Sequence, residues 1–147
     1  MRVEFTLKGE PQGKDRPRFT SRGGYVRTYT SQKTTAYEQA VRQAYLESTN
    51  MILEGPIIVT IRAYMSIPSS YSKAKAQRMR AGHERPTKKP DADNIAKVIL
   101  DGLNHLAYDD DKQVIELVVE KWYSDEPRIE VIVEEMEHKA QKAEHKA

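Results

Sequence analysis

Cysteine is absent from the 147-residue chain, and its absence limits both the covalent chemistry and the metal chemistry of the protein. Without thiols the chain forms no disulfide and holds no zinc through cysteine. No apolar run approaches the roughly 20 residues that a membrane-spanning helix needs, so we expect no membrane association. The first five residues, Met1 to Phe5, are typical of a strand and not of a signal peptide. We therefore expect a cytoplasmic protein.

The apolar content is moderate, at 38% hydrophobic against 31% charged residues, which suits one core in a soluble globular protein. No internal repeat or change of composition marks a domain boundary. We expect a single domain over residues 1–137, followed by a polar tail over residues 138–147.

Charge is abundant and strongly segregated, although the net charge is only +2. Residues 1–33 carry eight basic and three acidic side chains, and residues 62–90 carry eight and one. Residues 91–137 reverse the balance, with four basic and fourteen acidic side chains. A basic platform around an acidic centre suits a metal-dependent nuclease, which must attract phosphates and hold cations. On charge alone, an ordinary solvated surface with local charge bias fits equally well.

The hydrophobic periodicity predicts an α+β fold of two layers, in which helices pack on a small mixed sheet of about four strands. We expect strands over about residues 2–8, 57–64, 114–122 and 128–134, and helices over about residues 32–48, 71–80 and 93–105. Ser31 is the expected N-cap of the first helix. Residues 9–30 show no periodicity and are rich in Gly, Pro, Arg and Tyr, which indicates a long functional or disordered loop.

Two groups of aspartates flank the third expected helix. Asp91 and Asp93 lie at its start, and Asp109 to Asp111 follow its end. Crowded carboxylates repel one another unless they are solvated or bound to cations, and oxygen ligands suit Mg²⁺ or Mn²⁺. The alternatives are a helix N-cap at the first group and a solvated turn at the second. A helix of about 13 residues is roughly 20 Å long, so the groups meet only if the chain returns along the helix.

The acidic segment resembles the RusA family of Holliday-junction resolvases, which are small homodimeric endonucleases of bacteria and prophages. The resemblance covers about residues 88–115 and is carried by the patterns Asp91-x-Asp93-Asn94-x-x-Lys97, Asp101-x-Leu103 and Asp110-Asp111-x-Gln113. The basic loop Gly13 to Arg18 and the two closing strands also fit, whereas the rest of the N-terminal third is less similar. The resemblance implies that Asp91, Asp93 and Asp111 bind a divalent metal, Mg²⁺ or as a substitute Mn²⁺. It also implies that Lys97 is a further catalytic residue.

The resemblance further implies phosphodiester hydrolysis in DNA recombination and repair. A homodimer would make paired symmetrical nicks in four-way junction DNA. Candidate phosphate contacts are the basic residues Lys14, Arg16, Arg18, Arg27, Lys88 and Lys89. Two other functions stay open at this point: a DNA-binding protein whose metal site is not catalytic, and a nuclease that acts on flaps or forks.

Three finer expectations concern individual side chains. Asp101 is expected to pair with Lys97, one turn earlier on the same helix. Relatives often carry Gly after the Asn that ends the helix, where this chain has Asn104 followed by His105, and we expect Asn104 itself to take the left-handed cap conformation. The four tyrosines Tyr25, Tyr29, Tyr37 and Tyr45 are expected to divide between core and loop, and base stacking is an alternative for Tyr25 and Tyr29.

Overall fold

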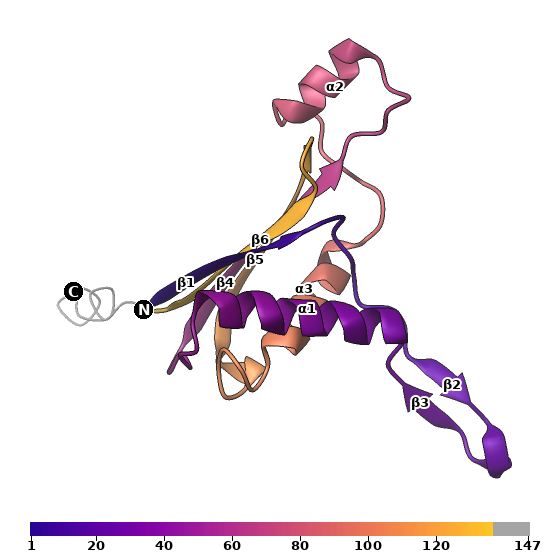
Figure 1. Cartoon of the computed structure of the whole chain (residues 1–147), viewed down its shortest axis with the longest axis vertical. Helices are drawn as coiled ribbons and strands as arrows, with labels where there is room; N and C mark the ends of the chain where they lie inside the picture. Colours follow the sequence, from indigo (N-terminus) through magenta and orange to yellow (C-terminus); the bar gives the residue numbers. More distant parts are fainter. Residues whose placement is uncertain (137–147) are drawn as a thin grey trace.

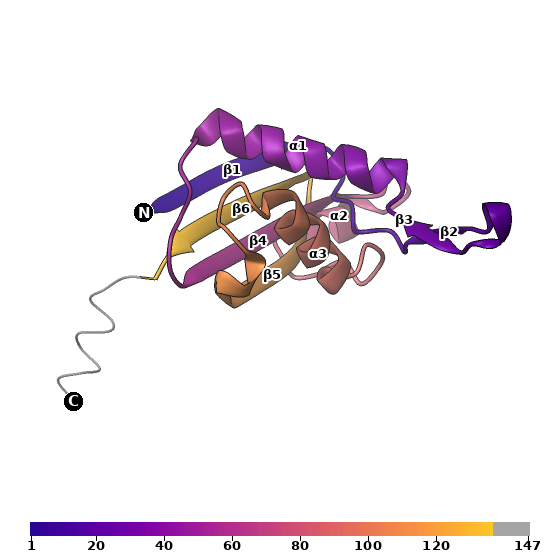
Figure 2. The same cartoon turned by 90° about the horizontal axis from the view of Figure 1, so that it is seen from below.

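The computed structural model describes residues 1–136, except for the side chains of Arg18 and Arg22. It shows a four-stranded sheet with two helices on one face (Figures 1 and 2). The sheet consists of β1 (Arg2–Lys8), β4 (Ile57–Ser66), β5 (Val114–Ser124) and β6 (Arg128–Glu135). The helices are α1 (Gln32–Ser48), α2 (Lys73–Arg80) and α3 (Ala92–Leu103). The predicted α+β class, with a small mixed sheet, is confirmed.

The strand order in the sheet is β1-β6-β4-β5. β6 is antiparallel to both of its neighbours, while β4 and β5 are parallel and are joined by the crossover that contains α2 and α3. Parallel neighbours need such a long connection, because a hairpin can join only antiparallel strands. The crossover places α3 against the sheet and gives β5 an edge position.

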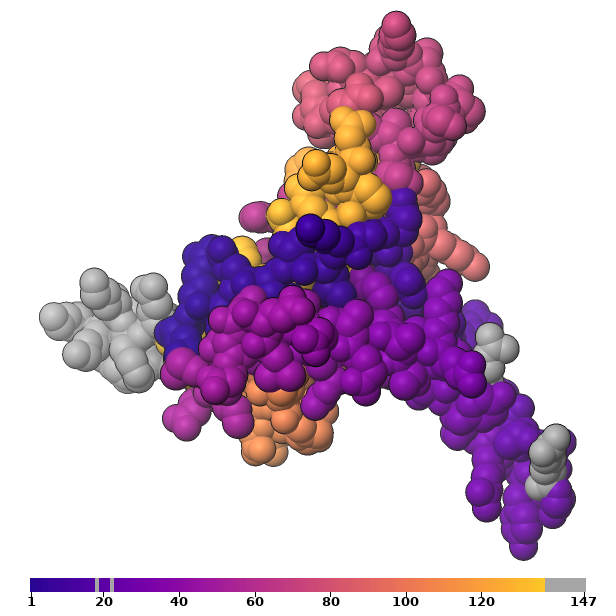
Figure 3. Space-filling view, in the orientation of Figure 1, coloured from indigo at the N-terminus to yellow at the C-terminus, as the bar shows by residue number. Residues whose placement is uncertain are grey.

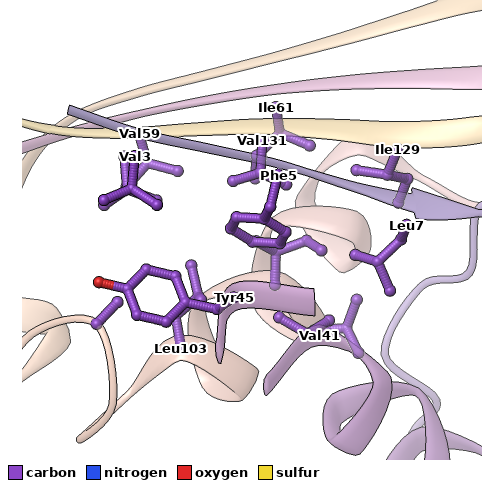
Figure 4. Packing of buried hydrophobic residues seen from close by; sticks show 14 of the residues in the cluster. Val3, Phe5, Leu7, Val41, Tyr45, Val59, Ile61, Leu103, Ile129 and Val131 are labelled. Carbon is purple, nitrogen blue, oxygen red and sulfur yellow. The ribbon is translucent and has the colours of Figure 1, made fainter. Parts of the chain in front are cut away.

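The core lies between the sheet and the helices α1 and α3 (Figure 4). β1 alternates exposed and buried residues, so that Val3, Phe5 and Leu7 all point toward the helices. From α1, Val41 and Tyr45 are fully buried against them, and Phe5 and Tyr45 meet edge to face with ring centroids 5.9 Å apart. Burying each such side chain stabilises the fold by about 1.5–3 kcal/mol. This core fixes the position of α3, whose first turn carries the acidic motif.

The interval 9–30 contains more structure than its sequence suggests. β2 (Arg18–Thr20) and β3 (Arg27–Tyr29) pair as an antiparallel hairpin with a 3₁₀ turn, η1 (Arg22–Gly24), between them. The expectation of a structureless loop was therefore wrong for residues 18–29. The hairpin projects away from the domain, at the end opposite to α2 (Figures 1 and 3). Strands of three residues are too short to show a period, which is why the pattern missed them.

No helix among residues 1–136 is both long enough and apolar enough to cross a membrane. The predicted polar tail lies outside the described residues.

Candidate active site and adjoining basic pocket

The start of α3 presents two free carboxylates. Asp91 is the N-cap residue, and its backbone carbonyl accepts the N–H of Ile95 at 3.0 Å. Its side chain, however, makes no capping hydrogen bond, so the capping alternative does not account for the carboxylate. Asp93 follows in the first turn, where the helix dipole favours negative charge. Both side chains are exposed and form no hydrogen bond or ion pair within residues 1–136.

Lys97 lies one turn beyond Asp93 and is also exposed and unpaired within the described part of the chain. The expected pair between Lys97 and Asp101 was wrong. Instead, the ammonium of Lys14 contacts the carboxylate of Asp101 and lies 3.5 Å from that of Glu38. Burial alone would lower the pKa of Lys14, but the hydrogen bond and charge of Asp101, together with Glu38, raise it above its ordinary value. Lys97 is thus left free for another partner.

Asp111 lies at the other end of α3. The chain turns at His105, the hydroxyl of Tyr108 donates to the carbonyl of Leu100 at 3.0 Å, and the N–H of Asp111 donates to Asn104 Oδ1 at 3.0 Å. After His105, the chain therefore runs back along α3 by only about one helical turn. Along the helix axis, the Asp93 and Asn104 positions are separated by about 16 Å.

The neighbours of Asp111 have structural roles. Asp110 is the N-cap of a short 3₁₀ helix, η2 (Asp111–Gln113), and forms a capping box with Gln113. The N–H of Lys112 donates to the Asp110 carboxylate, and this hydrogen bond is the main cause of a lowered Asp110 pKa. The backbone carbonyl of Asp109 accepts from the ring of His105 at 2.6 Å if Nδ1 carries the proton.

The structure therefore brings two of the three predicted metal ligands close together. Asp91 and Asp93 share the first turn of α3, while Asp111 lies beside its last turn. Within residues 1–136, no three His, Asp or Glu side chains lie close enough together to hold a metal. Mg²⁺ nevertheless commonly binds through one or two carboxylates, with water and substrate phosphates as its remaining ligands. The free, oxygen-only pair Asp91–Asp93 fits this kind of site in its donor type.

The left-handed residue after α3 is not the one expected. Asn104 has extended geometry, with φ −62° and ψ 133°, whereas His105 has φ +63°. The left-handed conformation thus occurs one residue later than expected, at His105. Asn104 instead uses its side chain to accept the Asp111 N–H.

A pocket of about 490 Å³ opens beside Asp91. Its walls come from the loop that follows β1, from Lys33 on the first turn of α1, and from the segment that enters α3. The lining residues are Pro11, Gln12, Gly13, Lys14, Asp15, Arg16, Lys33, Lys89, Pro90, Asp91 and Asn94. The Lys14 N–H donates to the Asn94 carbonyl at 2.9 Å, and a Cβ on Gly13 would lie only 2.9 Å from that of Asn94. The loop therefore packs directly on α3.

The predicted phosphate contacts have different environments. Arg16 and Lys89 line the pocket, and Lys14 lines it while its ammonium is engaged by Asp101 and Glu38. Lys88 lies 5.8 Å from the ring centroid of Tyr123, outside the pocket lining. Arg27 is exposed on the projecting hairpin, and the Arg18 side chain is not among those described. The fold by itself does not test contact with DNA, so all six stay predictions.

Sequence reasoning missed Lys33 as a member of this group. The available signal was its place two residues after the expected N-cap Ser31, because the N-terminus of a helix favours bound anions. The Ser31 cap itself is confirmed, since its hydroxyl accepts the N–H of Thr34 at 3.2 Å.

A two-layer α+β domain with free carboxylates beside unpaired cations is the arrangement expected of a small nuclease. The chain belongs to the RusA endodeoxyribonuclease family, because the family model described as "Endodeoxyribonuclease RusA" matches residues 8–134. It is also 40% identical over 137 residues to "Uncharacterized protein YqaN" of Bacillus subtilis (strain 168), covering 91% of this chain and 96% of that protein. The resemblance found in the acidic motif is thereby confirmed.

Proposed function

We propose that the protein is a metal-dependent endonuclease that resolves Holliday junctions by paired, symmetrical nicks. The observation that carries the proposal is the pair of free carboxylates at the start of α3, Asp91 and Asp93, in a chain of the RusA family. Both carboxylates are exposed and have no partner among the described residues, so their oxygens are available to a divalent cation.

In this proposal Asp91 and Asp93 hold Mg²⁺, for which Mn²⁺ can substitute. When bound, the metal lowers the pKa of a water and stabilises charge on the phosphate oxygens. Lys97, which has no partner within residues 1–136, neutralises charge that develops on the scissile phosphate. Asp111 becomes a third ligand only if the segment around η2 approaches the first turn of α3.

Four-way junction DNA is the proposed substrate, and a homodimer the proposed form of the enzyme. Paired nicks need two active sites related by two-fold symmetry, which a C2 dimer supplies. The edge strand β5 supports dimer formation, because its apolar residues Ile115, Leu117 and Val118 are 53%, 43% and 44% exposed. Natural proteins seldom leave such an edge uncovered.

Cleavage of defined DNA substrates tests the proposal. With Mg²⁺, the wild type should nick a synthetic four-way junction symmetrically and leave linear duplex intact. Asp93→Asn should abolish cleavage while junction binding persists or tightens, because the change removes negative charge near DNA. Asp109→Asn is the matched control and should stay active, since among the described residues only the backbone of Asp109 has a partner. Nicking by Asp93→Asn at a rate comparable to the wild type would contradict the assignment of Asp93 as a metal ligand.

Two further variants separate the roles of the remaining residues. Lys97→Ala should lower the single-turnover rate strongly without affecting folding, because Lys97 forms no ion pair within residues 1–136 whose loss would destabilise the protein. Asp111→Asn should also be inactive if Asp111 is a ligand, and should resemble Asp109→Asn if it is not.

The same substrates decide between the alternative functions. Preferential cutting of a flap or a fork would indicate a nuclease with another substrate. Tight junction binding without cleavage in Mg²⁺ or Mn²⁺ would indicate a DNA-binding protein whose metal site is not catalytic.

A further inference from the structure

The pocket beside Asp91 has a wall held by buried hydrogen bonds. Ser31 and Thr34 are the buried polar residues of the described chain, at 3% and 2% exposure. Both serve the loop that follows β1: the Thr34 hydroxyl accepts the N–H of Asp15 at 3.1 Å, and the Ser31 hydroxyl donates to Asp15 Oδ2 at 3.0 Å. Buried polar groups are retained where they are fully bonded and fix one arrangement. Here they hold the loop against α1.

The other side of the loop is held just as closely against α3. Lys14 donates its N–H to Asn94, and its ammonium is held by Asp101 and Glu38. Gly13 permits this approach, because a Cβ there would lie 2.9 Å from Asn94 Cβ and 3.0 Å from Pro90 Cβ. The pocket is therefore preformed between two helices, which reduces the ordering cost of binding.

Three cations line this pocket without a partner. Arg16, Lys33 and Lys89 come from the loop, from α1 and from the segment before α3, and none forms an ion pair or hydrogen bond within residues 1–136. Of the two carboxylates in the lining, that of Asp15 accepts from Ser31, and that of Asp91 is the proposed metal ligand. Cations gathered in a preformed concavity favour an anionic ligand.

We propose that this pocket binds a non-scissile phosphate of the cleaved DNA strand, adjacent to the phosphate at Asp91, with Lys33 as a previously unassigned phosphate contact. The proposal rests on the proposed nuclease function, because Asp91 borders both sites. A strand whose scissile phosphate lies at the Asp91–Asp93 carboxylates brings its neighbouring phosphates close by, since they are covalently linked. Lys33, Arg16 and Lys89 neutralise one of them and thereby fix the register of the strand.

A thermodynamic cycle tests this contact by combining single methylphosphonate substitutions in the DNA with Lys33→Ala in the protein. A methylphosphonate removes the charge of one phosphate, and it is placed in turn at each of about three phosphates on either side of the branch point of a four-way junction. Binding is measured without Mg²⁺, and single-turnover cleavage is measured with it. Lys73→Ala is the matched control, because Lys73 is an exposed lysine on α2 outside the pocket. Thermal unfolding of each variant checks that the fold is retained.

At the phosphate that the pocket binds, the methylphosphonate should weaken junction binding by the wild type about ten-fold, the usual scale for a charge-assisted hydrogen bond. Lys33→Ala should weaken binding to the unmodified junction similarly, and the two changes together should cost little more than either alone. Lys73→Ala should instead add to the methylphosphonate effect at every position. Additive behaviour of Lys33→Ala at all positions would show that Lys33 is only a solvated surface charge, and would overturn the proposal.

The two readouts separate this proposal from the function on which it rests. If the wild type cuts junctions but shows no coupling at any phosphate, the pocket is not a phosphate site and the nuclease function stands. If coupling appears in binding while no cleavage occurs, the phosphate site stands and the nuclease function falls.

Discussion

His105 lies in a backbone region that is costly for any residue with a Cβ. Its φ of +63° follows directly after α3 and starts the turn that brings Tyr108 back to Leu100. A non-glycine residue there costs roughly 1–2 kcal/mol. When Nδ1 carries the proton, the ring offsets part of this cost by donating to the Asp109 carbonyl at 2.6 Å.

A matched pair of substitutions measures the backbone cost at this position. His105→Ala and His105→Gly both remove the ring and its contact, but only Gly adopts the left-handed conformation freely. His105→Gly should therefore be more stable than His105→Ala by about 1 kcal/mol in urea-induced unfolding. If His105→Ala is at least as stable to unfolding as His105→Gly, the left-handed geometry of residue 105 is wrong.

Single residues also explain which site contacts were predictable. The spacing of Asp91, Asp93 and Lys97 along one helix follows from the sequence alone, because residues two and four apart have a fixed relation in a helix. The pairing of Lys14 with Asp101 could not be predicted, because it joins residues from distant parts of the chain. It depends on how closely Gly13 lets the loop approach α3, which is a tertiary effect.

At the scale of elements, long periodic segments were predicted well. The first helix was expected over residues 32–48 and the first strand over 2–8, and both have these bounds. The third helix, expected over 93–105, ends at Leu103 because His105 reverses the backbone direction. The strand expected over 57–64 extends to Ser66, since it stays paired with β5 to that residue. The hairpin β2–β3 was missed because its strands of three residues are too short to show a period.

The hairpin is peripheral to the core, which makes it a separable element. Phe19 and Tyr25 are 70% and 72% exposed, and Tyr29 is exposed as well, whereas Tyr45 is fully buried in the core and Tyr37 packs against it. The expected division of the tyrosines between core and loop is therefore confirmed. From Arg16 to Tyr37 the chain carries five basic residues and no acidic one. Exposed aromatics among cations suit nucleic acid better than a protein core.

Removing the hairpin should impair DNA binding and leave folding intact. Because Arg18 pairs with Tyr29, a short Asn-Gly turn can replace residues 18–29. The free energy of unfolding should change by less than about 1 kcal/mol, as no described hairpin side chain belongs to the core. The slope of log K against log[salt] should fall by about 0.9 for each phosphate that the shortened protein no longer neutralises. An unchanged slope and affinity would place the hairpin outside the DNA surface.

At the scale of the whole molecule, basic elements lie at two ends and the acidic turn of α3 lies between them. The hairpin and α2 project in opposite directions (Figures 1 and 3). α2 is anchored by its buried residues Ala76 and Met79, and Arg85 stacks on Trp122 of β5 at 3.4 Å. A single chain thus offers one candidate catalytic centre with cationic surface on either side. The proposed paired cuts require a second copy in a fixed orientation.

The edge of β5 is the surface where we expect that second copy to bind. Two β5 edges that pair antiparallel about a two-fold axis would extend the sheet and cover Leu117 and its apolar neighbours. Light scattering at micromolar concentration should therefore give a mass twice that of the 16.9-kDa chain. Leu117→Lys should give monomers that remain folded, because Leu117 is not part of the core cluster. Leu46→Lys is the matched control, since Leu46 is 48% exposed on α1 and should leave the dimer intact.

The same pair of variants connects assembly to function. If the dimer coordinates the two cuts, Leu117→Lys should nick one strand of a junction without the symmetrical partner nick, and Leu46→Lys should behave as the wild type. The chemistry at each site should persist in the Leu117→Lys monomer, because Asp91 and Asp93 lie together on one chain. A wild type that is monomeric yet still makes paired nicks would rule out a preformed dimer. A dimer that survives Leu117→Lys would place the interface on a surface other than the β5 edge.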